Sequence, residues 1–162
     1  MAYVDYDFYK TEYFGNTIAT ADFTRYAERA SDKIDLITFD RLVDGLPSDE
    51  RATAKVKKAV CAVAEILAKI EAFETRAGAA AGYETDADTG KMVGKIITSK
   101  SAGSEAISYS AGSVSYLKNS SLVGAVLSDK QAQDRLLYEA AADYLGGVCT
   151  DDGIPLLYAG CE

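Results

Sequence analysis

Histidine and tryptophan are both absent from this chain of 162 residues. Without histidine there is no imidazole general base, no histidine-activated serine or cysteine nucleophile, and no imidazole metal ligand. The only three cysteines, Cys61, Cys149 and Cys161, are widely spaced and form no C-x-x-C pair. This pattern argues against a disulfide framework and a zinc site, and it favours a reducing compartment. We therefore expect no catalytic activity, no metal and no cofactor.

Long apolar runs are also missing. No stretch approaches the ~20 consecutive apolar residues that span a membrane. The first residues are acidic and aromatic, whereas a signal peptide begins basic and then becomes apolar. With 26% charged and 48% hydrophobic residues, the composition is that of a soluble globular protein. We predict a single domain over residues 1–162 that makes no membrane contact.

The net charge of −8 is unevenly distributed. Residues 1–50 hold 11 acids and 5 bases, residues 51–100 hold 6 acids and 9 bases, and residues 101–162 hold 8 acids and 3 bases. The concentrated basic face of a sequence-specific nucleic-acid-binding protein is not present. Acidic ends and a basic middle could instead pair between copies of the same chain.

Apolar spacing predicts a mainly α fold, a small bundle of about four helices. The expected helices cover residues 4–13, 21–38, 49–76 and 129–145. In the third and longest, the apolar seam consists of Val56, Val60, Val63, Leu67 and Ile70. Thr20 is the expected N-cap of the second helix, and Ser128 with Gln131 forms a capping box for the last. Cys61 lies beside the seam, so we expect a buried, unreactive thiol.

Tyrosine is frequent, with 11 residues, and Tyr6, Tyr9 and Tyr13 share one stripe of the first expected helix. Tyrosine combines a large contact area with a polar tip, which is typical of protein interfaces. The stripe either packs the first helix onto the bundle or contacts a partner.

Residues 78–94 are small, polar and rich in turn residues, which indicates an exposed loop. Lys95–Ser99 and Ala106–Ser110 then predict a β-hairpin over residues 95–110. An isolated hairpin is marginal in water, so we expect it to contact a neighbouring subunit. The side chains expected at that contact are Ile96, Ile97, Ile107 and Tyr109. Residues 111–127 are compatible with either a strand or buried coil.

An apolar segment lies close to the C-terminus, within an extended arm expected over residues 147–162. Its apolar side chains are Ile154, Leu156, Leu157 and Tyr158. Chain ends usually fray unless they dock, so the arm docks either on its own core or on a neighbouring subunit.

Arg51, Lys55 and Lys58 form a basic stripe at helical spacing. Three interpretations remain open: a solvated helix face, a contact with an acidic neighbour, or a contact with passing DNA. Gly90-Lys91 lacks the rest of a phosphate-binding loop, and the segment from Asp86 lacks the ligand spacing of a calcium-binding EF-hand.

Taken together, several stretches resemble the head–tail connector (adaptor, head-completion) proteins of long-tailed phages. The resemblance covers nearly the whole chain and is carried by residues 3–9, 13–23, 29–39, 57–65, 97–110 and 144–160. Its motifs are packing and turn residues in a fixed order. The spacer at residues 148–153 and the acidic segment at residues 83–90 are both longer than in the family pattern.

This resemblance implies a helical bundle with a β-hairpin and a C-terminal arm. It also implies a structural protein of the virion neck, assembled in the host cytoplasm as a ring of about twelve copies beneath the portal. The ring would extend the DNA channel and carry the stopper or tail-completion protein. The arm would dock on the portal, and the hairpin and basic stripe would lie between subunits. DNA contact would be transient and non-specific, with acids of the first or last helix lining the channel.

Two other functions stay open at this point. A small helical adaptor or regulatory module could use the same apolar C-terminus to bind a partner. Another neck or tail-completion component would share the overall build.

Overall fold

The computed structural model describes residues 2–80, 83–85, 92–94, 101–102, 105–106 and 129–157. The chain divides into two compact units, one formed by Met1–Lys69 with Asp134–Glu162 and the other by Ile70–Gln133. Within the described ranges, no helix is both long enough and apolar enough to cross a membrane.

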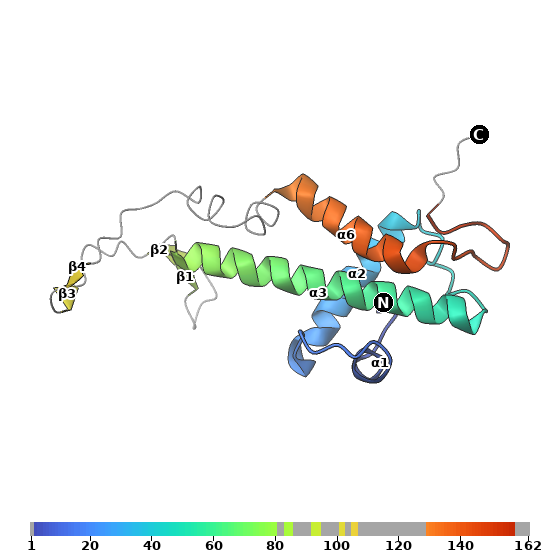
Figure 1. Ribbon diagram of the computed structural model, residues 1–162, viewed down its shortest axis with the longest axis horizontal. Coiled ribbons are helices and arrows are strands. Elements are labelled where there is room, and N and C mark those ends of the chain that lie inside the picture. The colour runs from blue at the N-terminus through green and yellow to red at the C-terminus, as the bar shows by residue number, and fades with distance from the viewer. Residues whose placement is uncertain are drawn as a thin grey trace. The chain divides into compact units, whose positions relative to one another are not determined.

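The described chain is mainly helical, as the apolar spacing predicted. Its helices are α1 (Tyr6–Thr11), α2 (Thr20–Ile37), α3 (Glu50–Ala80) and α6 (Lys130–Leu145) (Figure 1). Three of the four expected ranges agree with these bounds to within two residues at each end. The third helix was expected to end near residue 76 but continues to Ala80, because the alanines around Gly78 favour helix strongly enough to outweigh that glycine.

The helix starts differ from expectation in one clear case. Asp5 caps α1, its carboxylate accepting a hydrogen bond from Phe8 N at 2.8 Å. The prediction that Thr20 caps α2 is wrong, because the helix already begins at Thr20 and Ala19 occupies the N-cap without a side-chain hydrogen bond. Burial of Ile18 fixes the chain at this point, so tertiary contacts set where α2 begins.

Asp129 lies at the N-cap of α6. Its carbonyl accepts from Gln133 N at 2.9 Å, and its carboxylate accepts from Gln131 N at 3.2 Å. The expected capping residue, Ser128, lies outside the described residues.

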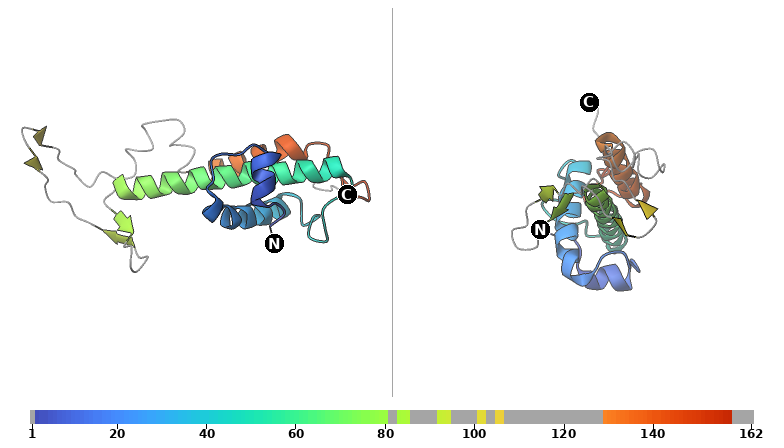
Figure 2. Two further views of the ribbon diagram at one scale, coloured as in Figure 1. Left: turned by 90° about the horizontal axis from the view of Figure 1, so that it is seen from below. Right: turned by 90° about the vertical axis from the view of Figure 1, so that its left-hand side faces the viewer.

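The core of the first unit forms on one face of α3, where Val56, Val60 and Val63 are fully buried. Helices α2 and α6 lie on different sides of α3 (Figure 2). Alanines at the contacts permit close approach of the helices. The other buried members of this core include Ala27, Ala30, Ile34, Ala59, Cys61, Ala64, Leu137, Ala141, Leu145 and Leu156.

Tyr9 joins α1 to this core through both its ring and its hydroxyl group. The side chain is fully buried, and its hydroxyl donates to Glu65 Oε1 of α3 at 2.9 Å. The hydroxyl oxygen of Tyr9 also accepts hydrogen bonds from the backbone N–H groups of Thr17 and Ile18, at 2.9 and 3.1 Å. One side chain therefore holds α1, α3 and the segment leading into α2.

The segment after α1 wraps closely around the Tyr9 ring. A Cβ atom at Gly15 would lie 2.0 Å from the ring, so only glycine fits there. The ring also contacts Phe23 and Tyr13, with centroid distances of 4.9 and 5.9 Å. Tyr6 and Tyr13 pack against the core as well, which confirms that the tyrosine stripe packs the first helix onto the bundle.

The second unit contains short antiparallel strand pairs. Strand β1 (Tyr83–Thr85) pairs with β2 (Met92–Gly94), within the segment predicted to be an exposed loop. Strand β3 (Ser101–Ala102) pairs antiparallel with β4 (Glu105–Ala106).

The longer hairpin predicted over residues 95–110 is not supported. Residues 101–102, which lie between its two expected strands, are themselves paired in β3. The proposed contact residues Ile96, Ile97, Ile107 and Tyr109 lie outside the described residues, as do residues 111–127.

Replacing Tyr9 with phenylalanine should lower the free energy of unfolding by about 1–3 kcal/mol, because Glu65 and two backbone N–H groups lose their common partner. Tyr138→Phe is the matched control, since Tyr138 is 45% exposed. Urea denaturation measures both variants. Equal stability of the two variants would show that the Tyr9 hydroxyl does not hold these segments together.

Cys61 is fully buried, as predicted, and burial beside the negative charge of Glu65 raises its pKa from 9.0 to about 12. The folded state therefore holds this proton more tightly than the unfolded chain does. The resulting stability is fully present below pH 9 and is lost as the pH rises toward 12. Cys61→Ala should make that alkaline decline shallower than the parent's in urea titrations at increasing pH. Identical declines for Cys61→Ala and the parent would refute this origin.

Candidate interaction surfaces

The chain after α6 folds back on itself in a short loop, residues 146–157, named here the C-terminal loop. Gly147, at φ +73°, ends the helix in the left-handed conformation that glycine adopts freely. Leu156 N then donates to Val148 O at 2.9 Å, and Thr150 N donates to Ile154 O at 2.8 Å. The loop is therefore held by its own backbone hydrogen bonds.

At Leu156 the C-terminal arm docks on the chain's own core, which was one of the two expected alternatives, so the portal contact expected for this residue is wrong. Its side chain is fully buried among the helices, and Leu157 packs against the same cluster. Ile154 is 45% exposed, and Tyr158 lies outside the described residues. The sequence pattern could not distinguish docking on the chain's own core from docking on a neighbouring subunit. The reason is that Leu156 faces the core whereas Ile154 faces solvent.

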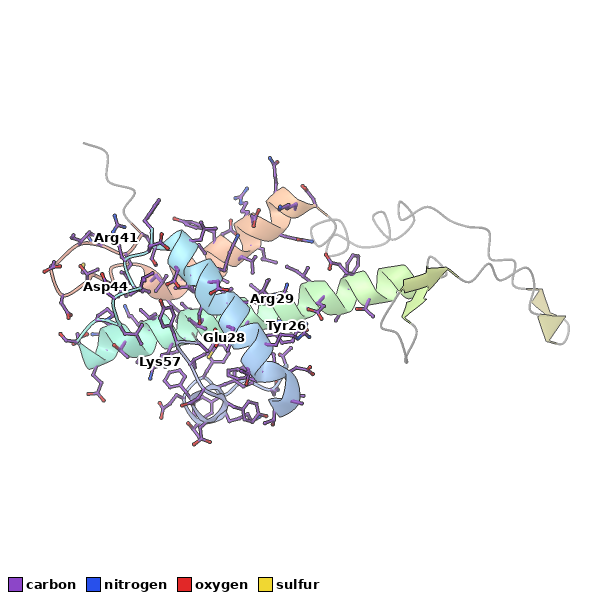
Figure 3. The ribbon with its side chains drawn as sticks, turned by 180° about the vertical axis from the view of Figure 1, so that it is seen from behind. Tyr26, Glu28, Arg29, Arg41, Asp44 and Lys57 are labelled. Carbon is purple, nitrogen blue, oxygen red and sulfur yellow. The ribbon has the colours of Figure 1, made fainter. Side chains whose placement is uncertain are left out.

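Two side-chain contacts attach the C-terminal loop to the rest of the first unit. Arg41 Nη1 donates to the carbonyls of Pro155 and Leu156 at 3.2 and 3.1 Å. At the other end of the loop, Asp151 Oδ1 accepts from Ser48 N at 2.7 Å and Ser48 Oγ at 2.9 Å. Arg41 is labelled beside this loop in Figure 3.

An exposed surface that mixes apolar and acidic side chains follows the end of α2. We name it the acidic loop surface; its members are Leu36, Phe39, Asp40, Val43 and Asp44. The three apolar side chains are 67%, 54% and 63% exposed in that order, and both aspartates are exposed. Large apolar side chains gathered at the surface are a common mark of an interaction site.

The backbone holds Phe39 outward at some energetic cost. Phe39 and Asp40 both have φ 58°, in the left-handed region that non-glycine residues avoid at about 1 kcal/mol or more each. Buried neighbours fix this turn, since Thr38 donates to Ile34 O at 2.9 Å and Leu42 is only 1% exposed. Asp40 N also donates to Asp35 O at 2.8 Å.

The N-terminal segment contacts the same turn, residues 38–42, through Tyr3. The Tyr3 hydroxyl donates to Asp35 Oδ1 at 2.5 Å and lies 3.1 Å from Leu42 O. Burial and the negative charge of Asp35 raise the pKa of Tyr3, so the phenol stays protonated at neutral pH. The phenol therefore remains a hydrogen-bond donor to the turn.

The predicted basic stripe lies on α3, with Arg51 exposed and Lys55 and Lys58 half-buried. Arg51 and Lys55 line a hollow of about 510 Å³ together with residues 147–151, whereas Lys58 lies outside this lining. In the part of the chain that the structure describes, none of these three cations has an ion-pair partner. The structure thus places two members of the stripe beside the C-terminal loop.

The two aspartates that also line this hollow are already hydrogen-bonded. Asp49 accepts from Ala52 N at 2.7 Å at the start of α3, and Asp151 accepts from Ser48. The cations of the stripe therefore remain available for an external partner.

A second hollow, of about 400 Å³, lies between the N-terminal segment, α2 and α3. Its lining includes Tyr3, Tyr6, Glu28 and Lys57, and the Lys57 ammonium lies 5.4 Å from the Phe8 ring centroid. Across the described ranges, no group of three or more acidic or cysteine side chains is placed to hold a metal ion.

The acidic loop surface was not predicted from the sequence. A usable signal was present, because Leu36 falls off the buried stripe of α2 formed by Phe23, Ala27, Ala30 and Ile34. A leucine outside the apolar stripe of an amphipathic helix is expected to face solvent. The outward position of Phe39 depends on its left-handed backbone and had no such signal.

Comparison of the chain with protein-family models, with curated proteins and with solved structures found no match.

Two neighbouring apolar residues of the C-terminal loop should respond very differently to truncation. Leu156→Ala removes a fully buried side chain and should lower the free energy of unfolding by about 2–5 kcal/mol. Ile154→Ala changes an exposed side chain and should remain within about 0.5 kcal/mol of the parent. Thermal and urea denaturation measure both. A Leu156→Ala variant as stable as Ile154→Ala would mean that the loop does not belong to the core.

Proposed function

We propose that this chain is a non-catalytic structural protein that assembles with copies of itself into a ring of about twelve subunits beneath a phage portal. The ring would join the DNA-filled head to the stopper or tail-completion protein. The motif order of the head–tail connector family supports this proposal over nearly the whole sequence.

The observation that carries the proposal is the presence of two dissimilar surfaces on one folded unit. The acidic loop surface exposes three large apolar side chains, and the basic stripe carries three cations without an ion-pair partner among the described residues. A ring requires such a heterologous interface, in which one face of each subunit meets a different face of the next.

The core supports the same function through rigidity. Arg41, Thr38 and Leu42 fix the acidic loop surface, while Asp151 and Ser48 fix the loop beside the basic stripe. Preformed surfaces lose little conformational entropy on association. A subunit built in this way can join a ring without refolding.

The finer parts of the proposal concern the end of the C-terminal arm and the lining of the channel. Ile154, exposed at the tip of the C-terminal loop, and Tyr158 are proposed portal contacts. The channel is proposed to be lined by acids of the first or last helix, which repel DNA phosphates and let the duplex slide. Asp7 of α1 and Asp143 of α6 are exposed candidates.

Mixing the full chain with the portal protein encoded in the same genome tests this function. We expect a closed ring on the portal, seen by electron microscopy and as a matching mass increase in analytical ultracentrifugation. Portal alone and chain alone are the controls, since a connector subunit can stay monomeric until it meets the portal. A chain that stays monomeric with the portal would favour a small helical adaptor, and turnover of a small molecule would make it an enzyme; either result contradicts the proposal.

A further inference from the structure

The acidic loop surface carries two aspartates that no ion pair of the described residues neutralises, and the Arg41 guanidinium lies over its Phe39 ring, 5.2 Å from the centroid. Asp40 and Asp44 are exposed, and neither has an ion-pair partner in the described residues. The cation between them, Arg41, directs its hydrogen bonds to the carbonyls of Pro155 and Leu156 instead. Apolar side chains flanked by free carboxylates suit a partner that is apolar and basic.

The basic stripe has the complementary character. Arg51, Lys55 and Lys58 follow one another at intervals of four and three residues, so they share one face of α3. The hollow beside Arg51 and Lys55 gives this face a concave part that can receive an apolar side chain. Arg51 and Lys55 of this lining can pair with Asp40 and Asp44 of another copy, while Asp49 and Asp151 of the same lining keep their hydrogen bonds from Ala52 N and Ser48.

The C-terminal loop separates the two surfaces within one chain. Residues 147–151 of this loop line the hollow with the basic stripe, whereas residues 155–156 accept hydrogen bonds from Arg41 beside the acidic loop surface. Both surfaces belong to the same compact unit, and in the described residues no ion pair joins an aspartate of the acidic loop surface to a cation of the basic stripe. Their pairing is therefore open to a second molecule.

We infer that the acidic loop surface of one copy binds the basic stripe of the next copy, with Phe39 directed toward the hollow beside Arg51 and Lys55. This inference rests on the proposed self-assembly and names the surfaces that meet in it. Such an interface is heterologous, so repeating it generates a ring or an open filament. Nucleic acid as the partner would use the basic stripe but would be repelled by the acidic loop surface.

Charge reversal tests the inference with two complementary variants. Asp40→Lys with Asp44→Lys makes both surfaces of a subunit basic, and Arg51→Glu with Lys55→Glu makes both surfaces acidic. Each variant alone should assemble on the portal on the order of 10-fold or more weakly than the parent, because like charges meet at every interface. An equimolar mixture should regain assembly, because opposite charges then meet between alternating subunits.

The matched control carries the same change of charge away from both surfaces and from the proposed channel lining, as Asp22→Lys with Glu74→Lys, and should assemble like the parent. Circular dichroism and thermal melts establish that each variant is folded, and restored assembly in the mixture cannot come from misfolded chains. Sedimentation velocity with the portal gives the readout.

The outcomes separate this inference from the proposed function. A parent that assembles while both charge-reversal variants also assemble normally would overturn the interface and leave the ring intact. Two variants that fail alone and fail together would also overturn it. A parent that never assembles with the portal would contradict the interface and the proposed function together. If Arg51→Glu with Lys55→Glu assembled normally but no longer retained DNA, while Asp40→Lys with Asp44→Lys retained it, the basic stripe would bind DNA and not a second copy.

Discussion

Burial of one face of α3 is the constraint on which the rest of the described structure depends. Val56, Val60 and Val63 lie fully inside a cluster that also receives α1, α2, α6 and Leu156 of the C-terminal loop. Segments distant in sequence thereby share one packing surface. The hydrophobic effect supplies the main driving force, and each fully buried side chain contributes roughly 1.5–3 kcal/mol.

The surfaces proposed for assembly are extensions of this core. Leu42 and Leu156 are buried anchors within loops that also carry exposed side chains such as Val43 and Ile154. Polar contacts then fix the outward parts, such as the bond from Arg41 to the Leu156 carbonyl. Stability and assembly are therefore coupled, because a core that loosens under either loop also releases the surface that the loop presents.

The helices could be predicted from the sequence because apolar residues repeat at helical spacing along each of them, and this repeat identifies the buried face. The basic stripe was equally readable, since helical spacing alone places its members on one face. Other features depend on contacts between distant residues. Tyr9 reaches Glu65, 56 positions along the chain, and no local pattern encodes that bond.

Loops were the least predictable part, again for a physical reason. An apolar C-terminal segment implies docking but does not say where, and Leu156 proved to belong to the chain's own core while Ile154 stays exposed. The left-handed backbone at Phe39 and Asp40 is imposed by packing around Leu42 and Thr38. Sequence preference opposes that conformation, so it could not be anticipated.

The proposed assembly pairs the acidic surface of one subunit with the basic surface of the next. Asp40 and Asp44 belong to the acidic loop surface and Arg51, Lys55 and Lys58 to the basic stripe, so one unit carries the two unlike surfaces that a head-to-tail contact requires. The most direct measurement is an electron cryomicroscopy structure of the chain assembled on its portal. The account predicts Asp40 and Asp44 of each subunit within ion-pair distance of Arg51, Lys55 or Lys58 of the next. A ring in which either surface faces solvent would contradict it.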